Sequence, residues 1–328
     1  MLRTLDLSTA RSLLASRDQL LSRRWTDRQI GTRVAGGDLI RVRRGWYVEG
    51  AAWRGLWSEG QHLLDVLAAH LNAEGEGPVF SGESAAVLWG LPLYRHTPSL
   101  VHALLDGTRH GRTRAGILWH PQSEIDLQDI VTIDGIRCTS MDRTVIDAAR
   151  TLPVGAAVSL ADAALRRAAV REHEQDAEAA ADWRERLGSR LDESRARGVR
   201  VARRVIAFAD GRAQLPGESV SRLHLARLGF RTPGLQESVI GSRGNRYWLD
   251  FAFRGARVFG EFDGEGKYLD PELLRGSSTH GVLLEEKRRE DDIRGVTGWR
   301  LIRWGSEHIR SSGTLGARLS AFGVHPPG

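Results

Sequence analysis

Two short runs near the C-terminal end of the chain constrain its fold more than any other feature. Residues 247–253 and 257–263 are rich in aromatic and branched side chains, and Arg254-Gly255-Ala256 separates them. The pattern predicts two strands, Tyr247–Phe253 and Arg257–Asp263, joined as a hairpin. If Gly255-Ala256 is a two-residue turn, glycine takes the first central position of a type II′ turn. Residue 254 then lies opposite 257, and residue 250 lies opposite 261.

This register gathers acidic side chains on one face of the hairpin. Asp250 and Glu261 lie opposite each other with Cβ atoms roughly 5 Å apart, and Asp263 follows on the same face. The other face presents apolar side chains to a core, namely Leu249, Phe251, Phe253, Val258 and Phe262. Clustered carboxylates repel, so they need a cation, a shared proton or solvent. We therefore expect Asp250 and Glu261 to bind Mg²⁺ (or Mn²⁺) with water and phosphate oxygens. The alternative is a set of solvated acids on an ordinary edge hairpin.

Both lysines of the chain fall in the same region. Of 47 basic residues only Lys267 and Lys287 are lysine, which hints at positions where a compact, titratable ammonium is needed. Lys267 follows a loose turn at 264–266. Lys287 lies on a predicted charged helix, Leu284–Arg294, in one stripe with Glu290 or Asp291 and Arg294. We expect one of the two lysines to lie beside the acids.

The rest of the chain divides into further segments. A length of 328 residues exceeds one small core, and we expect an α/β (α+β) multidomain fold. Pro216-Gly217 predicts a domain boundary. Residues 216–328 are then expected to contain, in order, a helix, the hairpin, the charged helix and a strand, which together form a mixed sheet flanked by helices. Ala, Glu, Asp and Arg dominate 170–197, so 170–215 is predicted to be an exposed helical connector. Residues 61–169 are predicted to form a middle α/β region.

The first segment, residues 1–60, has the pattern of a winged helix-turn-helix. Thr26 and Gln29 form a capping box that starts a helix at Asp27, and the alternation of apolar and basic residues over 39–48 predicts a strand, a turn and a strand. Arg28 and Arg33 would lie on the helix that enters the major groove, and Arg41, Arg43 and Arg44 on the wing would contact phosphates. The alternative is a small α/β cap whose arginines are merely solvated.

Bulk composition agrees with a nucleic-acid partner but only weakly. The formal charge is +6 and the pI about 10.1, which favours nucleic acid or other acidic surfaces. The single cysteine, Cys138, excludes an intrachain disulfide and a zinc cage of cysteines. No apolar run reaches about 18 residues and no signal-peptide pattern precedes residue 17, so we expect a cytoplasmic protein without a membrane partner.

The terminal segment resembles the PD-(D/E)XK nucleases over about Pro216–Ile309. Glu261-Phe262-Asp263-Gly264, with Lys267 soon after and a charged helix around Lys287, is similar to the subgroup related to very-short-patch repair endonucleases. The resemblance implies that Asp250 and Glu261 bind the metal and that Glu218 is an accessory acid reaching it through water. Asp263 stands where the parent motif has its lysine. Either Lys267 or Lys287 then supplies the positive charge, or the domain is a degenerate, inactive relative.

The first half of the chain resembles AbiEi-type antitoxins of type IV toxin–antitoxin systems. The similar segments are residues 43–47, 84–91 and 139–144. This resemblance implies a DNA-binding autoregulator that counters a nucleotidyltransferase toxin. Two functions therefore follow from the sequence: a metal-dependent DNA endonuclease, or a non-catalytic antitoxin and transcriptional regulator with a degenerate nuclease domain.

Overall fold

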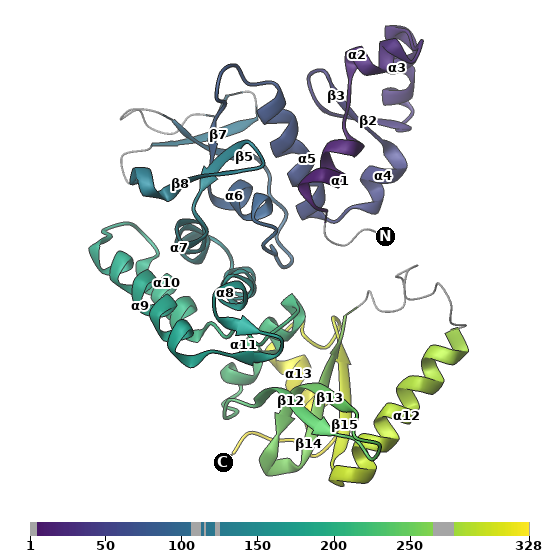
Figure 1. The fold of residues 1–328 in the computed structure, drawn as a ribbon, viewed down its shortest axis with the longest axis vertical. Helices are drawn as coiled ribbons and strands as arrows, with labels where there is room; N and C mark the ends of the chain where they lie inside the picture. Colours follow the sequence, from purple (N-terminus) through teal and green to yellow (C-terminus); the bar gives the residue numbers. More distant parts are fainter. Residues whose placement is uncertain (1–4, 106–112, 115, 122–124, 265–278, 328) are drawn as a thin grey trace. The chain divides into compact units, whose positions relative to one another are not determined.

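The computed structural model describes residues 5–105, 113–114, 116–121, 125–264 and 279–327. In these ranges the chain combines helices with four β-sheets (Figure 1). It forms two compact units: the N-terminal unit of residues 1–153 and 195–202, and the C-terminal unit of residues 154–194 and 203–328. The expected mixture of helices and several sheets in more than one unit is confirmed.

The N-terminal unit begins with three helices and a small antiparallel sheet. In chain order the elements are α1 (Leu7–Leu13), β1 (Ala15–Ser16), α2 (Arg17–Ser22), α3 (Asp27–Ala35), β2 (Leu39–Arg43) and β3 (Trp46–Glu49). The sheet order is β1-β3-β2. Thr26 caps α3 through the predicted capping box with Gln29, and Ser16 caps α2 in the same way. A core of Leu20, Ile30, Leu39 and Tyr47 holds these elements together.

A larger mixed sheet forms the remainder of the N-terminal unit. Its strands are β4 (Val79–Phe80), β5 (Val101–Leu105), β6 (Thr113–Arg114), β7 (Ile117–Pro121), β8 (Ile130–Ile133) and β9 (Ile136–Thr139), in the order β6-β7-β5-β4-β9-β8. The accompanying helices are α4 (Gly50–Gly55), α5 (Ser58–Leu71), α6 (Gly82–Leu88) and α7 (Met141–Thr151), with a 3₁₀ turn at Leu127–Asp129. Helix α6 contacts α5, α7 and β5, which makes it the central helix of this part.

The C-terminal unit opens with helices and a short hairpin. These are α8 (Val154–Ala169), the hairpin of β10 (Val170–Arg171) and β11 (Glu174–Gln175), and α9 (Ala177–Glu193). Helix α10 (Val199–Phe208) follows, its last six residues belonging to this unit. The expectation of an exposed connector here is wrong at α9, which buries Trp183, Leu187 and Leu191. These three residues recur at helical spacing, and they supply the apolar stripe that the charged composition conceals.

The last part of the C-terminal unit is a four-stranded sheet between helices. Its elements are α11 (Pro216–Arg227), β12 (Gly234–Ile240), β13 (Arg246–Phe253), β14 (Val258–Asp263), α12 (Thr279–Thr297), β15 (Arg300–Gly305) and α13 (Ser312–Ser320). The sheet order is β12-β13-β14-β15, and the pairing is antiparallel except between β14 and β15, which run parallel. Helix α11 packs on one face, where a Cβ at Gly217 would lie 2.0 Å from the ring of Phe262. Helix α12 packs on the other face through Ile293.

The hairpin of β13 and β14 has the predicted register but a different turn. Residues 254–256 form a 3₁₀ turn and Arg257 adopts a left-handed conformation with φ 52°, so the predicted type II′ turn at Gly255-Ala256 is wrong. Phe253 pairs with Val258 and Phe251 with Gly260. A four-residue loop closed by 253 and 258 gives the same pairs as a two-residue loop closed by 254 and 257, and the ladder ends at Phe251 and Gly260.

The two faces of this hairpin are both covered. The residues predicted to face a core are all buried, with Leu249, Phe251, Phe253, Val258 and Phe262 each at most 7% exposed. Leu249, however, packs with Ala252, Phe259 and Ile293 on the side of α12, so its predicted face is wrong. On the acidic face, Ala252 and Phe259 are also buried, because α12 lies over them. Glu261 therefore lies beside a packed helix, and the face of the sheet that we expected to be solvated is partly a second core.

Among the helices within the described ranges, none combines the length and apolar character required to cross a membrane.

Candidate acidic site and nucleic-acid interface

The predicted acids come from three elements of the C-terminal unit. Glu218 lies in the first turn of α11, Asp250 on β13, and Glu261 and Asp263 on β14. The ladder between β13 and β14 ends at Phe251 and Gly260. Asp250 is linked through Gln236 to Glu218 of α11, whereas Glu261 contacts Arg289 of α12 and lies on the face that α12 covers. Asp263, two residues along, shares that face. The observed pairs do not reach Asp250 and Glu261, so the predicted gathering of Asp250 with Glu261 and Asp263 on one face stays a prediction.

Glu218 and Asp250 are linked by one amide group. Nε2 of Gln236, on β12, donates to Oδ1 of Asp250 at 3.2 Å and to Oε2 of Glu218 at 3.5 Å. Glu218 also accepts from the backbone N–H of Gln214 at 2.8 Å, and Asp250 from the backbone N–H of Phe262 at 2.9 Å. Burial, and next the charge of Asp250, raise the pKa of the Glu218 carboxyl well above its ordinary value.

Glu261 is held instead by two arginines. Arg289 of α12 donates to its Oε1 at 2.6 Å, and Arg303 of β15 to its Oε2 at 3.1 Å. The Glu261 side chain is 6% exposed. Burial acts to raise the pKa of Glu261, but the hydrogen bond and charge of Arg289, together with Arg303, outweigh it, so the pKa lies below its ordinary value. Glu261 is therefore a charged, fully paired carboxylate.

Of the two predicted lysines, Lys287 can be placed, and its side chain does not lie beside the acids. The side of α12 that faces the sheet carries Glu286, Arg289, Glu290 and Ile293, since Glu286 and Glu290 form ion pairs with Arg303. Lys287 points away from this side and is exposed, because one helical residue rotates a side chain by about 100°. Of the two alternatives for the expected stripe, Lys287, Asp291 and Arg294 are all exposed, and Arg294 pairs with Asp291, whereas Glu290 lies on the side that faces the sheet. Lys267 lies outside the described residues.

The fit of a divalent cation can be judged from the donors. Within the described ranges, no group of three or more acidic, histidine or cysteine side chains is arranged to hold a metal ion. Both oxygens of Glu261 already accept hydrogen bonds from arginines. Asp250 and Glu218 fit better, because they are two neighbouring carboxyls that share the amide of Gln236, and carboxylate oxygens are the ligands that a hard cation prefers.

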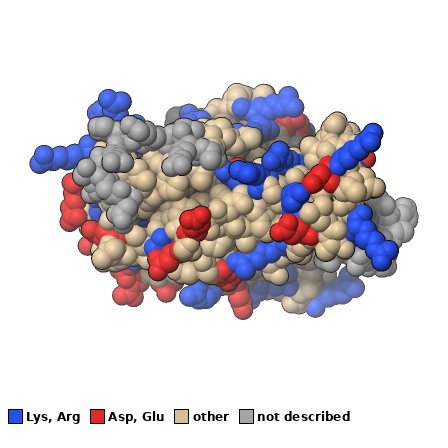
Figure 2. Space-filling model, turned by 90° about the horizontal axis from the view of Figure 1, so that it is seen from above, with Lys and Arg blue, Asp and Glu red and all other residues tan. Residues whose placement is uncertain are grey.

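The predicted DNA-contacting arginines of the N-terminal unit divide into two groups. Arg28 and Arg33 on α3, and Arg41 and Arg44 on the hairpin of β2 and β3, are exposed. Arg33 also lies over the ring of Trp25, 4.4 Å from its centroid. On the face shown in Figure 2, basic side chains are interspersed with acidic ones and form no single continuous patch. These four arginines are available for phosphate contacts.

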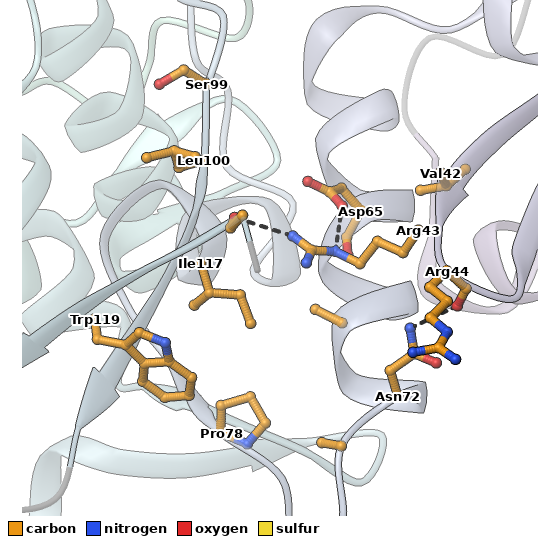
Figure 3. A pocket seen from close by; sticks show the side chains of 13 residues that line it. Val42, Arg43, Arg44, Asp65, Asn72, Pro78, Ser99, Leu100, Ile117 and Trp119 are labelled. Carbon is orange, nitrogen blue, oxygen red and sulfur yellow. Dashed lines mark hydrogen bonds and ion pairs between the residues drawn. The ribbon is translucent and has the colours of Figure 1, made fainter. Parts of the chain in front are cut away.

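Arg43 is not available, which corrects one prediction. Its Nε donates to the carboxylate of Asp65 on α5 at 2.5 Å, and its Nη2 donates to the carbonyl oxygen of Gly116 at 3.2 Å. Figure 3 shows the guanidinium turned toward Asp65, at the wall of a cavity of about 570 Å³. The strand pairing shifts between Arg41 and Arg43, and such a bulge re-aims the side chain that follows it. Arg43 therefore ties the hairpin to α5.

Sequence reasoning missed the partners of the acids. Gln236, His173, Gln214, Arg289 and Arg303 all lie in the network, and none was predicted as a site residue. The parallel pairing that sets Glu261 beside Arg303 could have been inferred once the strand order was known. No local signal indicates His173, since it reaches Gln236 across 63 residues.

The sequence of the chain is similar to those of other proteins. No protein-family model matches the chain. Two uncharacterised proteins of Mycobacterium tuberculosis are similar to it, MT2308 of strain CDC 1551 / Oshkosh and Rv2248 of strain H37Rv. Each is 29% identical over 298 residues, which cover 90% of this chain and 96% of the relative. Neither compact unit alone contains 298 residues, so the similarity extends across both units.

Proposed function

We propose that this chain is a DNA-binding protein whose C-terminal unit hydrolyses phosphodiester bonds with the help of Mg²⁺ or Mn²⁺. The element order α11-β12-β13-β14-α12-β15, with β14 and β15 parallel, is the order expected of the nuclease fold that the sequence resembles. The observation that carries the proposal is the approach of Glu218 on α11 to Asp250 on β13, which share the amide of Gln236.

The residues of the site have separate roles in this proposal. Asp250 and Glu218 supply oxygen ligands. Arg289 and Arg303, which hold Glu261, are the guanidinium groups proposed to face a phosphate. A bound Mg²⁺ would supply Lewis-acid polarisation of the phosphate and a more acidic water. Lys267 stays the predicted source of an ammonium that stabilises the charge developing on phosphorus, while exposed Lys287 is a weaker candidate.

The N-terminal unit supplies the contact with DNA. The order α1-β1-α2-α3-β2-β3 with an antiparallel hairpin is that of a winged helix-turn-helix. Arg28 and Arg33 lie on the helix that would enter the major groove, and Arg41 and Arg44 lie on the wing. Arg43 has no part in this contact because it is paired with Asp65.

Nicking of supercoiled DNA tests the catalytic proposal. With Mg²⁺ or Mn²⁺ present, wild-type protein is expected to nick the plasmid and Asp250→Asn to abolish nicking. Asp291→Asn is the matched control, since Asp291 is an exposed acid on α12 that pairs with Arg294. Equal nicking by wild type and Asp250→Asn identifies a contaminating nuclease and rejects the proposal.

A non-catalytic regulator is the second candidate. It is favoured by the two arginines that neutralise Glu261 and by Asp263 in place of the motif lysine. In that case the chain acts as an antitoxin-like repressor, with DNA and a nucleotidyltransferase toxin as partners. It predicts a gel shift on its own promoter that strengthens as salt falls, with no nicking under any metal. Absence of a shift at low salt on every duplex tested rejects DNA binding and both candidates.

A further inference from the structure

The hairpin of β10 and β11 reaches the acidic site from outside the four-stranded sheet. His173, at its turn, stacks on Trp248 of β13 with ring centroids 4.1 Å apart and planes at 12°. Its Nδ1 lies 3.2 Å from Oε1 of Gln236 and 2.9 Å from Nε2 of Gln214. A side chain from a separate hairpin is therefore fixed in two directions, by ring stacking and by hydrogen bonding.

Gln236 stands between this histidine and the two acids. The carboxylate of Asp250 can only accept a hydrogen bond, so the Gln236 amide must turn its N–H groups toward Asp250 and Glu218. Its Oε1 then faces Gln214, which donates to it at 2.9 Å, and His173. In one tautomer His173 donates to Oε1 directly, and in the other it accepts from Gln214. Both tautomers fix the same orientation of the Gln236 amide.

The backbone at Gln236 supports a specific role for this side chain. Gln236 has φ 48°, a left-handed conformation in the middle of β12, and it is 6% exposed. Residues other than glycine, asparagine and aspartate seldom adopt this conformation, and such positions cluster at functional sites. The conformation lets a strand residue direct its amide to the end of α11 as well as to β13.

We propose that His173 is a positioning residue of the acidic site, acting through Gln236 on the carboxyls of Asp250 and Glu218. The proposal rests on the phosphodiesterase function proposed above. The hairpin is anchored for this role, because Gln175 accepts from the backbone N–H of Gly211 at 2.7 Å and Arg166 donates to the carbonyl of Glu172. The site accordingly includes residues from 166 to 214, and the predicted domain starting at residue 216 lacks part of it.

Mn²⁺ binding by the full chain tests the proposal. His173→Phe keeps a ring to stack on Trp248 but loses the Nδ1 hydrogen bonds, and it is expected to bind Mn²⁺ about 10-fold more weakly, as loss of an outer-shell partner does. His173→Asn keeps hydrogen-bonding atoms near the Nδ1 position and is expected to recover most of the affinity. His325→Phe, at an exposed position, is the matched control and should bind as wild type. Unchanged affinity in His173→Phe overturns the proposal.

A second measurement separates this proposal from the proposed function. Selective ¹⁵N labelling of glutamine, with Gln236→Asn for assignment, follows the side-chain amide of Gln236 without metal. His173→Phe is expected to shift or broaden that resonance, and His325→Phe to leave it unchanged. If wild type binds no Mn²⁺, the proposed metal site fails, and the amide resonance alone decides the positioning role. An unaltered Gln236 resonance in His173→Phe refutes it.

Discussion

Two acidic groups in the C-terminal unit lie on adjacent strands and are stabilised in opposite ways. Asp250 on β13 shares a neutral amide with buried Glu218, whereas Glu261 on β14 accepts from two guanidinium groups. The pKa of Glu218 rises because burial and Asp250 disfavour its charge, and the pKa of Glu261 falls because the arginines favour its charge. Position on a strand therefore does not decide what a carboxylate can do; its partners do.

The comparison assigns the two groups different work. A pair of neighbouring carboxyls that share one amide is suited to bind a cation, and a carboxylate neutralised by arginines is suited to hold α12 and β15 against β14. Arg289 and Arg303 come from these two elements, so Glu261 joins three elements at one point. We therefore expect Asp250 and Glu218 to act in catalysis, and Glu261 to stabilise the fold.

Loss of Arg303 should have the largest effect on stability. Arg303→Leu leaves Glu261 with one guanidinium and frees Glu286 and Glu290 from their partner. Removing one member of a buried ion pair costs about 3 kcal/mol, and urea unfolding measures it. Arg294→Leu is the control, since the Arg294–Asp291 pair is more than half exposed on both sides and should cost under about 0.5 kcal/mol. Equal costs would remove the structural role assigned to Glu261.

The two carboxyls should give opposite pH dependence. Glu218 has a raised pKa in the fold, so its contribution is present below the unfolded value and is lost as pH rises toward the folded pKa. Glu261 has a lowered pKa, so its contribution is present above the unfolded value and is lost as pH falls through the folded pKa. Thermal melts across pH should show that Glu218→Gln reduces the loss of stability as pH rises. They should show that Glu261→Gln reduces the loss of stability as pH falls. Parallel curves for the two variants would contradict the comparison.

Two arginines of the N-terminal unit allow the same comparison between a paired and an exposed side chain, with smaller expected changes in stability. Arg43→Ala leaves Asp65 without its guanidinium and should lower stability by about 1–2 kcal/mol, with the salt dependence of DNA binding unchanged. Exposed Arg41→Ala should leave stability within about 0.5 kcal/mol and reduce the salt slope of DNA binding by about 1. Chemical unfolding and DNA titrations at several salt concentrations measure both. A reduced slope in Arg43→Ala alone would reverse these assignments.

Local patterns in the sequence were sufficient to predict several elements. The capping box at Thr26 and Gln29 is confirmed, and so are the hairpin pairs next to the turn, Phe253 with Val258 and Phe251 with Gly260. The predicted turn type was wrong but these pairs were right, because lengthening the loop by one residue on each side leaves the same residues opposite each other. Apart from Leu249, the apolar face of the hairpin followed from alternation along the strands.

Long-range partners could not be predicted in this way. Glu261 meets Arg289 and Arg303 across 28 and 42 residues, and the choice of arginine over lysine depends on how α12 is rotated. Lys287 follows Glu286 by one residue on the helix, and this offset of about 100° directs its side chain to solvent. The bulge that turns Arg43 toward Asp65 also lacks a marker in the residues that form it.

Titration of the full chain with Mn²⁺ by calorimetry tests the central claim most directly. The account predicts that wild type and Glu261→Gln bind one ion and that Asp250→Asn does not. Binding abolished by Glu261→Gln and retained by Asp250→Asn would contradict it.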